Sequence, residues 1–188
     1  MSETTTSTGL AAVTGTWAID PTHSTIAFSA RHAMVAKVRG TFSEFEGTLV
    51  LDGENPAASK ADLTIQAASI DTKTADRDAH LKSPDFLDVE AFPTLTFTTT
   101  SVQHKGGNDF ALVGDLTIHG VTKPVTIAVE LVGVNADPWG GTRVGLEGKT
   151  EISRKDFGLT WNVAIEGGGI LVGDSIKIEL DVEAVKAV

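Results

Sequence analysis

Apolar and polar residues alternate one by one along most of this chain. Near the C-terminus, Ile176, Ile178 and Leu180 alternate with Lys177 and Glu179. A period of two places successive side chains on opposite faces of a β-strand. One polar face is typical of strands that are exposed to solvent on one face only. The pattern predicts eight strands, at about residues 16–32, 37–51, 60–70, 94–103, 109–118, 124–134, 142–153 and 174–185.

Turn-forming residues such as Asp52-Gly53-Glu54-Asn55-Pro56 separate the predicted strands. Loops this short favour antiparallel neighbours. Asp20-Pro21 interrupts the first strand, and we expect a bulge or bend there. The segment 74–82 lacks the period of two. It opens on Thr74, a potential N-cap, and ends on the basic residue Lys82. These signals predict one short helix near residues 74–82.

Eight amphipathic strands and one helix are compatible with a sandwich or with a barrel. Several predicted strands are ten residues or longer, and closure into a barrel removes the edges that they would otherwise expose. We therefore expect an all-β fold, a single eight-stranded antiparallel barrel. A barrel of this size is either filled by its own side chains or wide enough for one small ligand. Small residues at inward positions, such as Ala30, Gly40 and Gly114, leave both interpretations open.

The composition is that of one globular domain without covalent cross-links. A length of 188 residues suits a single domain, and because cysteine is missing, disulfides and thiolate metal sites are excluded. The formal net charge of −10 disfavours nucleic acids and anionic membrane surfaces as partners. We expect residues 1–14 to be a disordered tail without secretory-signal features, in front of a barrel domain at 15–188. No apolar run is long enough for a membrane span, so we expect a cytoplasmic protein with no integral membrane segment.

The five histidines do not form a recognisable metal motif. His23 and His32 lie nine residues apart, so they face opposite sides of an uninterrupted strand. Neither H-x-H nor H-E-x-x-H occurs, and we predict no metal site. His32 shares its parity with Phe28 and Ala30, so it is the histidine expected to point inward, as a polar contact for a ligand head group.

The residue patterns do not predict catalysis, and no catalytic residue is assigned. A nucleophile elbow of the G-x-S-x-G type does not occur. The acidic residues are scattered over outward faces, so a catalytic pair of carboxylates is not indicated. Arg77 and Arg154 are weaker candidates for contact with a ligand head group, and the interpretation that we favour for each is a surface ion pair.

A series of motifs occurs in a fixed order between residues 15 and 185. They are Trp17-Ala18-Ile19-Asp20, His23-Ser24-Thr25-Ile26-Ala27-Phe28, Val38-Arg39-Gly40-Thr41-Phe42, Ser69-Ile70-Asp71-Thr72, Arg77-Asp78-Ala79-His80-Leu81, Asp85-Phe86-Leu87-Asp88, Phe92-Pro93-Thr94-Leu95-Thr96-Phe97, the run from Gly114 to Val125, and Arg154-Lys155-Asp156-Phe157-Gly158-Leu159. No single motif is decisive, but taken together and in this order they make the sequence resemble the YceI-like family.

This resemblance implies a lipocalin-like barrel with an apolar tunnel, and it therefore favours a container over a filled core. Members of the family bind long isoprenoid chains, isoprenoid quinones or other amphiphilic lipids, and they are often dimers. The implied function is non-catalytic binding, storage or transport of such a lipid, or of a fatty-acid-like molecule, by a homodimer that requires no cofactor.

The resemblance and the parity within strands together select the residues that would line the tunnel. The candidates for contact with the apolar tail are Ile26, Phe28, Phe42, Phe45, Leu63, Ile65, Phe86, Leu95, Phe97, Leu116, Val129, Leu146 and Trp161. The candidates for orienting a polar head group near one mouth are His32, Arg77 and His80.

Two other classes of function are compatible with the sequence. An enzyme acting on an isoprenoid-like ligand would use His32 or His80 as an acid or base, although the sequence offers no second catalytic partner. A stress-response interaction module would have a filled barrel, and a structure without a continuous internal cavity would favour it.

Overall fold

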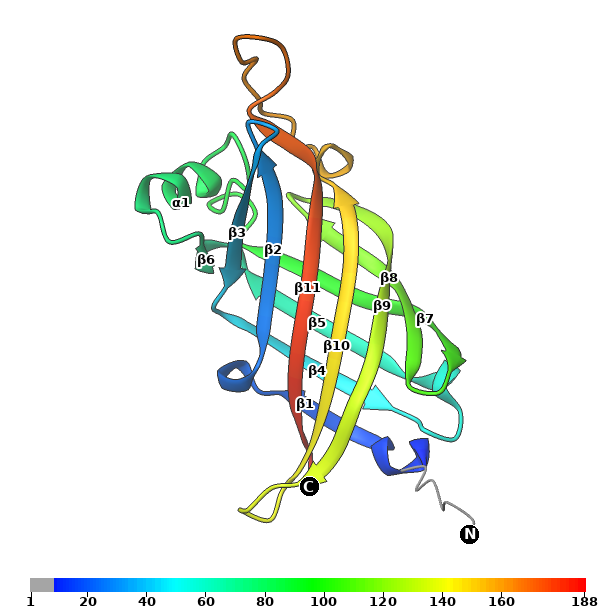
Figure 1. Ribbon diagram of the computed structural model, residues 1–188. Helices are drawn as coiled ribbons and strands as arrows, with labels where there is room; N and C mark the ends of the chain where they lie inside the picture. Colours follow the sequence, from blue (N-terminus) through cyan, green and yellow to red (C-terminus); the bar gives the residue numbers. More distant parts are fainter. Residues whose placement is uncertain (1–8) are drawn as a thin grey trace.

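The computed structural model describes residues 9–188, which form one antiparallel β-sheet with eleven strands and one α-helix (Figure 1). The helix is α1 (Ala75–Lys82). The strands are β1 (Gly15–Ile19), β2 (Thr25–His32), β3 (Ala36–Phe42), β4 (Phe45–Leu51), β5 (Lys60–Gln66), β6 (Ile70–Asp71), β7 (Thr94–Gly106), β8 (Asp109–Ile118), β9 (Val121–Ala136), β10 (Thr142–Ser153) and β11 (Val172–Lys186).

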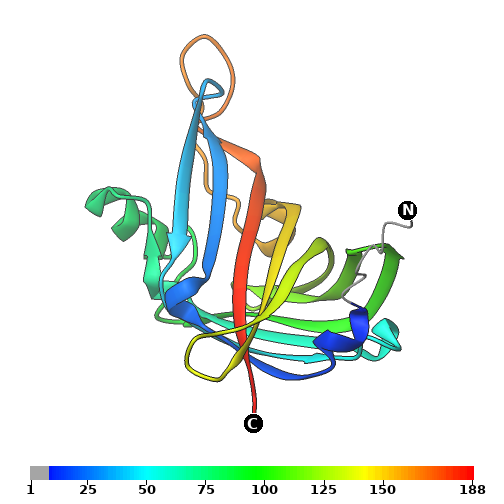
Figure 2. The same ribbon diagram turned by 60° about the horizontal axis from the view of Figure 1, so that its bottom comes forward.

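Eight of these strands close into a barrel. Their order is β1-β4-β5-β7-β8-β9-β10-β11, and β11 pairs back with β1, so that the ring has no free edge. The view from below shows the strands curving around a common interior (Figure 2). The eight-stranded antiparallel barrel predicted from the alternation is therefore confirmed.

One edge of strand β11 pairs with β10, and its other edge pairs with two different strands along its length. Its C-terminal end lies beside β1, with Trp17 opposite Lys186, whereas its remaining length lies beside β2, with Phe28 opposite Ile178. The predicted break in the first strand is confirmed, because a 3₁₀ turn at Pro21–His23 separates β1 from β2. The hairpin of β2 and β3, extended by β6, rises beyond the closed ring (Figure 1).

Two further breaks were not predicted. The expected strand 37–51 is divided at Ser43 and Glu44 into β3 and β4, and the expected strand 60–70 is divided by the 3₁₀ turn Ala67–Ser69 into β5 and β6. In each case the chain leaves one strand neighbour for another: β3 lies beside β2, whereas β4 lies beside β1 and β5. At each break the buried positions also change parity, from Phe42 to Phe45 and from Ala67 to Ile70. The alternation therefore marks both breaks, and the prediction of unbroken strands missed this signal.

The predicted helix near residues 74–82 is confirmed as α1, with Thr74 at the N-cap position. The Thr74 side chain does not cap the helix. Instead, Asp78 accepts hydrogen bonds from the backbone N–H and the hydroxyl of buried Thr72, at 2.8 and 2.6 Å. Arg77 donates to the Thr72 hydroxyl and carbonyl, at 2.8 and 2.7 Å. These bonds anchor the first turn of α1 to the end of β6. Among residues 9–188, no helix is long and apolar enough to cross a membrane.

An apolar cluster, which leaves only a small cavity of about 70 Å³, closes one end of the barrel. Trp17 lies at its centre, and the side chains of Val144 and Ala184 are equally inaccessible to solvent. The Trp17 indole Nε1 donates to the carbonyl of Val13 at 2.8 Å. Residues 1–8 of the predicted disordered tail lie outside the described residues. For Leu10–Val13 the prediction is wrong, because these residues form a 3₁₀ turn and Val13 is buried in the cluster.

A charged network lies beside this closed end. The guanidinium of Arg143 donates from Nη1 to Asp20 at 2.9 Å and to Glu183 at 2.7 Å, and from Nε to Asp137 at 3.1 Å. These bonds join the break between β1 and β2 to the turn between β9 and β10 and to β11. Hydrogen bonds from Thr22, His23 and Arg143 hold the pKa of Asp20 well below its ordinary value of 3.8.

The lowered pKa predicts how the stability of the barrel depends on pH. Because the pKa of Asp20 is lower in the folded chain than in the unfolded chain, its stabilising effect is complete above pH 3.8 and is lost as pH falls toward the folded value. Asp20→Asn should therefore lower the free energy of unfolding at neutral pH, and the difference from wild type should shrink at about pH 2.5. Urea titrations at both pH values measure it, and a difference that does not change with pH would contradict the prediction.

Candidate functional site

The barrel encloses an apolar cavity with a volume of about 540 Å³. Its wall includes side chains from every strand of the ring and from β2 and β3. Along β11 alone, lining residues extend from Val172 to Val182, which corresponds to roughly 33 Å of strand. The volume lies within the range of small-molecule sites, and the shape is elongated along the barrel.

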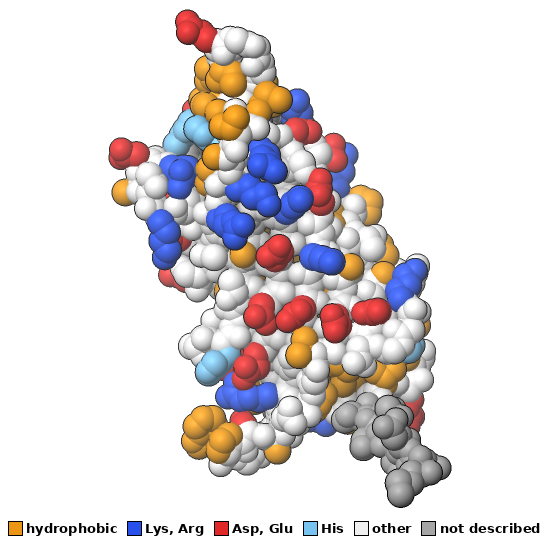
Figure 3. All heavy atoms as spheres, viewed as in Figure 1, with side chains coloured by type: hydrophobic (Ala, Val, Ile, Leu, Met, Phe, Trp, Pro, Cys, Tyr) orange, Lys and Arg blue, Asp and Glu red, His pale blue; other side chains and the backbone are white. Residues whose placement is uncertain are grey.

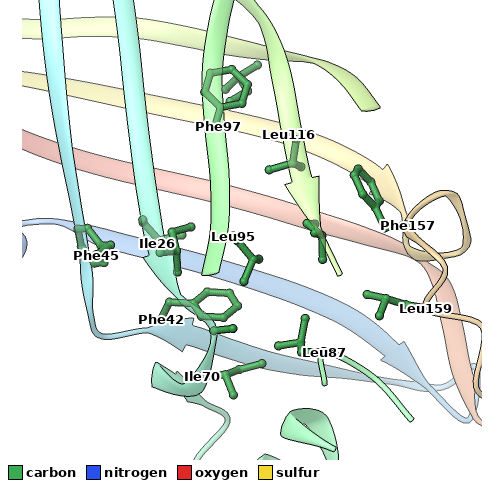
Figure 4. Packing of buried hydrophobic residues seen from close by; sticks show 14 residues of the cluster. Ile26, Phe42, Phe45, Ile70, Leu87, Leu95, Phe97, Leu116, Phe157 and Leu159 are labelled. Carbon is green, nitrogen blue, oxygen red and sulfur yellow. The ribbon is translucent and has the colours of Figure 1, made fainter. Parts of the chain in front are cut away.

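All thirteen residues predicted to contact an apolar tail lie on the cavity wall. Figure 4 shows Phe42, Leu95 and Leu116 among the side chains that project into the interior from different strands. Parity within a strand accounts for most of this selection, but Phe42 and Phe45 have opposite parity within the expected strand 37–51, and Phe86 and Trp161 lie outside the expected strands. The residues are Ile26, Phe28, Phe42, Phe45, Leu63, Ile65, Phe86, Leu95, Phe97, Leu116, Val129, Leu146 and Trp161. Whether they contact a ligand stays a prediction.

The two ends of the cavity differ. The cluster around Trp17 closes one end. At the other end, which we call the mouth, the lining residues include His32, Arg77, His80 and Trp161. His32 is exposed, Trp161 is half-buried and the His80 side chain is 39% exposed, so the cavity meets solvent there. A molecule that enters the barrel would therefore enter through the mouth.

The predicted polar residues lie together at the mouth, but they have different local roles. The imidazole of His80 is 2.9 Å from Asp85 and packs edge-on against Trp161 and Phe86, with ring centroids 4.6 and 5.0 Å away. His32 makes no side-chain hydrogen bond to any residue within 9–188. Arg77 is hydrogen-bonded to Thr72 and Thr74, so most of its donors already hold the base of α1. His32 and His80 are thus the residues best placed to meet a polar head group.

Arg154 is a cavity residue whose environment was predicted wrongly. It is not part of a surface ion pair, because only 3% of it is exposed and no carboxylate among residues 9–188 pairs with it. Its guanidinium donates to four backbone carbonyls at 2.7–3.2 Å, and burial lowers its pKa from 12.5. The carbonyls belong to Leu159, Trp161, Val172 and Gly173. The motif Arg154–Leu159 was the sequence signal that marked this residue as more than a surface charge.

A possible set of metal ligands, Asp20, His23 and Glu183, lies at the closed end. Their ligand atoms are within 4.8 Å of one another. However, Nη1 of Arg143 donates to both carboxylates, so a guanidinium already neutralises the place that a cation would take. We therefore assign these residues to the charged network and not to a metal site.

A closed antiparallel barrel with an apolar cavity open at one end defines a lipocalin-like protein. The chain also matches the family model of the YceI-like domain over residues 17–184. It therefore belongs to the YceI-like family. Protein YceI of Escherichia coli O17:K52:H18 is 47% identical over 137 residues, which cover 73% of this chain and 71% of that protein.

Solved structures share the fold. BcnA of Burkholderia cenocepacia superposes with a TM-score of 0.76 at 23% identity, over 88% of this chain and 98% of that chain. A polyisoprenoid binding domain from Saccharophagus degradans superposes with a TM-score of 0.69 at 13% identity, over 91% of this chain and 98% of that chain.

The bonds of Arg154 predict a large loss of stability when it is removed. Arg154→Met keeps the length of the side chain but removes a donor from four carbonyls, of which that of Val172 still accepts from Asn162. Buried acceptors without partners are costly. We expect the free energy of unfolding to fall by about 3 kcal/mol. The neighbouring Lys155 is exposed, so Lys155→Met is the matched control and should change stability little. Denaturant titrations compare the two, and equal small effects would contradict the role of Arg154.

Proposed function

We propose that this protein is a non-catalytic carrier of a long-chain amphiphilic lipid, an isoprenoid or an isoprenoid quinone. The observation that supports the proposal most strongly is the elongated apolar cavity of about 540 Å³. Each methylene group that such a wall removes from water contributes about 0.8 kcal/mol. A hydrocarbon chain along the barrel therefore binds through many small contributions, whereas a polar molecule would lose hydrogen bonds to water without replacing them.

The mouth suits the polar end of such a ligand. A chain that fills the barrel leaves its head group beside His32 and beside the His80–Asp85 pair, where hydrogen-bonding groups are half-exposed. Trp161 and Phe86 pack on His80 and cover the apolar part of the ligand next to the head. The neighbour from Saccharophagus degradans, which is named a polyisoprenoid binding domain, supports an isoprenoid as the class of ligand.

The alternatives have less support. A catalytic role for a cavity histidine would rest on His80, because Asp85 orients its imidazole at 2.9 Å. The two aromatic rings that pack on its imidazole, Phe86 and Trp161, offer no nucleophile or second acid. A filled interaction module is disfavoured because the barrel is open inside. The homodimer, a role in transport and the cytoplasmic location stay predictions.

Filling the cavity should abolish uptake without unfolding the barrel. Val129 lies on β9 and faces the cavity, so Val129→Trp places a large ring in the path of the chain. We expect all-trans-retinol, a fluorescent isoprenoid alcohol, to bind this variant at least tenfold more weakly, because the ring takes the space of several methylene groups.

The matched control comes from the same strand. Val132 is 59% exposed on the outer face, so Val132→Trp adds the same ring outside the barrel. Retinol binding should match wild type in this control, and circular dichroism should show folded protein for both variants. Equal binding by both variants would contradict a ligand inside the barrel.

A further inference from the structure

Two loops form an exposed apolar tip beside the mouth of the cavity. The tip consists of Met34 and Val35, in the turn between β2 and β3, and of Val163 and Ile170, in the loop before β11. Met34 is 63% exposed and Val35 is 81% exposed. Figure 3 shows hydrophobic side chains gathered at this end of the molecule. Large apolar side chains grouped on a projection commonly mark an interaction site.

The two loops form one surface because they are joined to each other. The backbone N–H of Ala33 donates to the carbonyl of Leu171 at 2.7 Å. The side chain of Met34 lies against Gly169, where a Cβ atom would collide with the Met34 sulfur. Leu171 and Trp161 from the second loop also line the cavity. The apolar tip is therefore continuous with the mouth.

The turn that carries the tip has an unfavourable sequence for its conformation. Ala33 and Met34 both have positive φ angles, of 49° and 63°. Two adjacent positions with positive φ in a hairpin turn are usually occupied by Asn-Gly or a similar pair. The chain instead keeps an apolar pair at the most exposed point of the hairpin, which indicates that the apolar surface itself has a use.

A group of basic side chains, which we call the basic belt, lies just behind the tip. The belt consists of Arg31, Lys37, Arg39 and Lys177, on the outer faces of β2, β3 and β11. In the strand register, Lys37 lies opposite Arg31, while Arg39 and Lys177 lie on either side of Ser29. Within residues 9–188, these four side chains form no ion pair. Figure 3 shows the belt as a blue patch beneath the hydrophobic end.

Three acidic residues of the same face lie away from the belt. Glu130, Glu147 and Asp181 lie side by side across β9, β10 and β11. Asp181 is four residues along β11 from Lys177, or roughly 13 Å. That distance exceeds the screening length of about 8 Å at physiological salt. Glu179, however, lies two residues from Lys177 on the same face, or roughly 7 Å. Glu151 lies opposite Lys177, and Glu166 lies in the loop of the tip. Four basic side chains thus have three acidic neighbours, and the belt is positive on balance.

We propose that the apolar tip and the basic belt dock the protein on an anionic lipid bilayer, with the mouth of the cavity at the membrane surface. This inference rests on the proposed function, since it gives the route by which a membrane lipid would enter the barrel. An apolar element inserts about 5–10 Å into the headgroup region. Lys37 lies two residues from Val35, or roughly 7 Å along the strand, so the belt would meet the lipid phosphates.

A bilayer fits this surface better than a protein partner. The tip is a narrow projection of two loop ends, and a stable protein interface needs about 800 Å² from each partner. The net charge of −10 predicted poor binding to anionic membranes. That expectation treats the charge as uniform, whereas an interaction at the surface depends on the charges within a screening length of it.

The experiment measures sedimentation of the wild-type chain with lipid vesicles. One set contains phosphatidylcholine alone, and the other contains about one-third phosphatidylglycerol. We expect binding to the anionic vesicles, weak binding to the neutral ones, and release from the anionic vesicles at about 0.5 M NaCl. Wild-type protein that stays in the supernatant with anionic vesicles would overturn the proposal.

Two double variants test the two parts of the surface. Met34→Ser with Val35→Ser removes the apolar tip, and Lys37→Glu with Arg39→Glu reverses half of the belt. Each should weaken binding to the anionic vesicles at least tenfold. In the controls, Trp139→Ser removes an 84% exposed side chain at the opposite end, and Lys60→Glu with Lys105→Glu makes the same change in net charge elsewhere. Controls that lose binding equally would also overturn the proposal.

Retinol uptake from solution separates this inference from the proposed function. If wild type takes up retinol but does not bind the anionic vesicles, the docking proposal is contradicted and the carrier function is not. Wild type that binds the vesicles but takes up no retinol contradicts the carrier and leaves docking intact. Tip and belt variants that take up retinol normally are shown to be folded, so their loss of vesicle binding is attributable to the surface.

Discussion

The division of one edge of β11 between two partners, β1 and β2, is the constraint on which the rest of the structure depends. Its C-terminal end pairs with β1 and closes the ring, and its longer N-terminal part pairs with β2. Closure at one end brings Trp17 into a dry apolar cluster that seals the barrel. The departure of β2 and β3 from the ring at the other end leaves room for α1 and for the loop held by Arg154. The same pairing thus produces a closed bottom and an open mouth.

Function follows from what these two ends enclose. The wall between them is apolar over roughly 33 Å of strand, which suits a chain better than a compact ligand. Polar and aromatic groups are concentrated at the mouth, where His80 packs against Trp161. The mouth also adjoins the apolar tip, so the place where a lipid would enter is the place where the molecule is best able to meet a membrane.

Local patterning predicted the elements and the face of each strand, but not relations between distant residues. Parity placed Phe28 and Phe97 on the cavity wall because alternation follows directly from strand geometry. The break at Ser43 shifts that alternation by one residue, from Phe42 to Phe45, but the shift does not show which strands become neighbours. The burial of Arg154 depends on carbonyls as far away as Gly173, and the segregation of Arg39 from Glu147 depends on the order of strands in the barrel. Composition and net charge average over such arrangements.

If the barrel holds a long-chain lipid, the native protein should keep that lipid through a gentle purification. Protein purified without detergent is extracted with organic solvent, and the extract is analysed by mass spectrometry. A long-chain, isoprenoid-type molecule should co-purify with wild type and be depleted in Val129→Trp. An extract without any apolar molecule, from protein that also takes up none when it is supplied, would show that the barrel is not a lipid container.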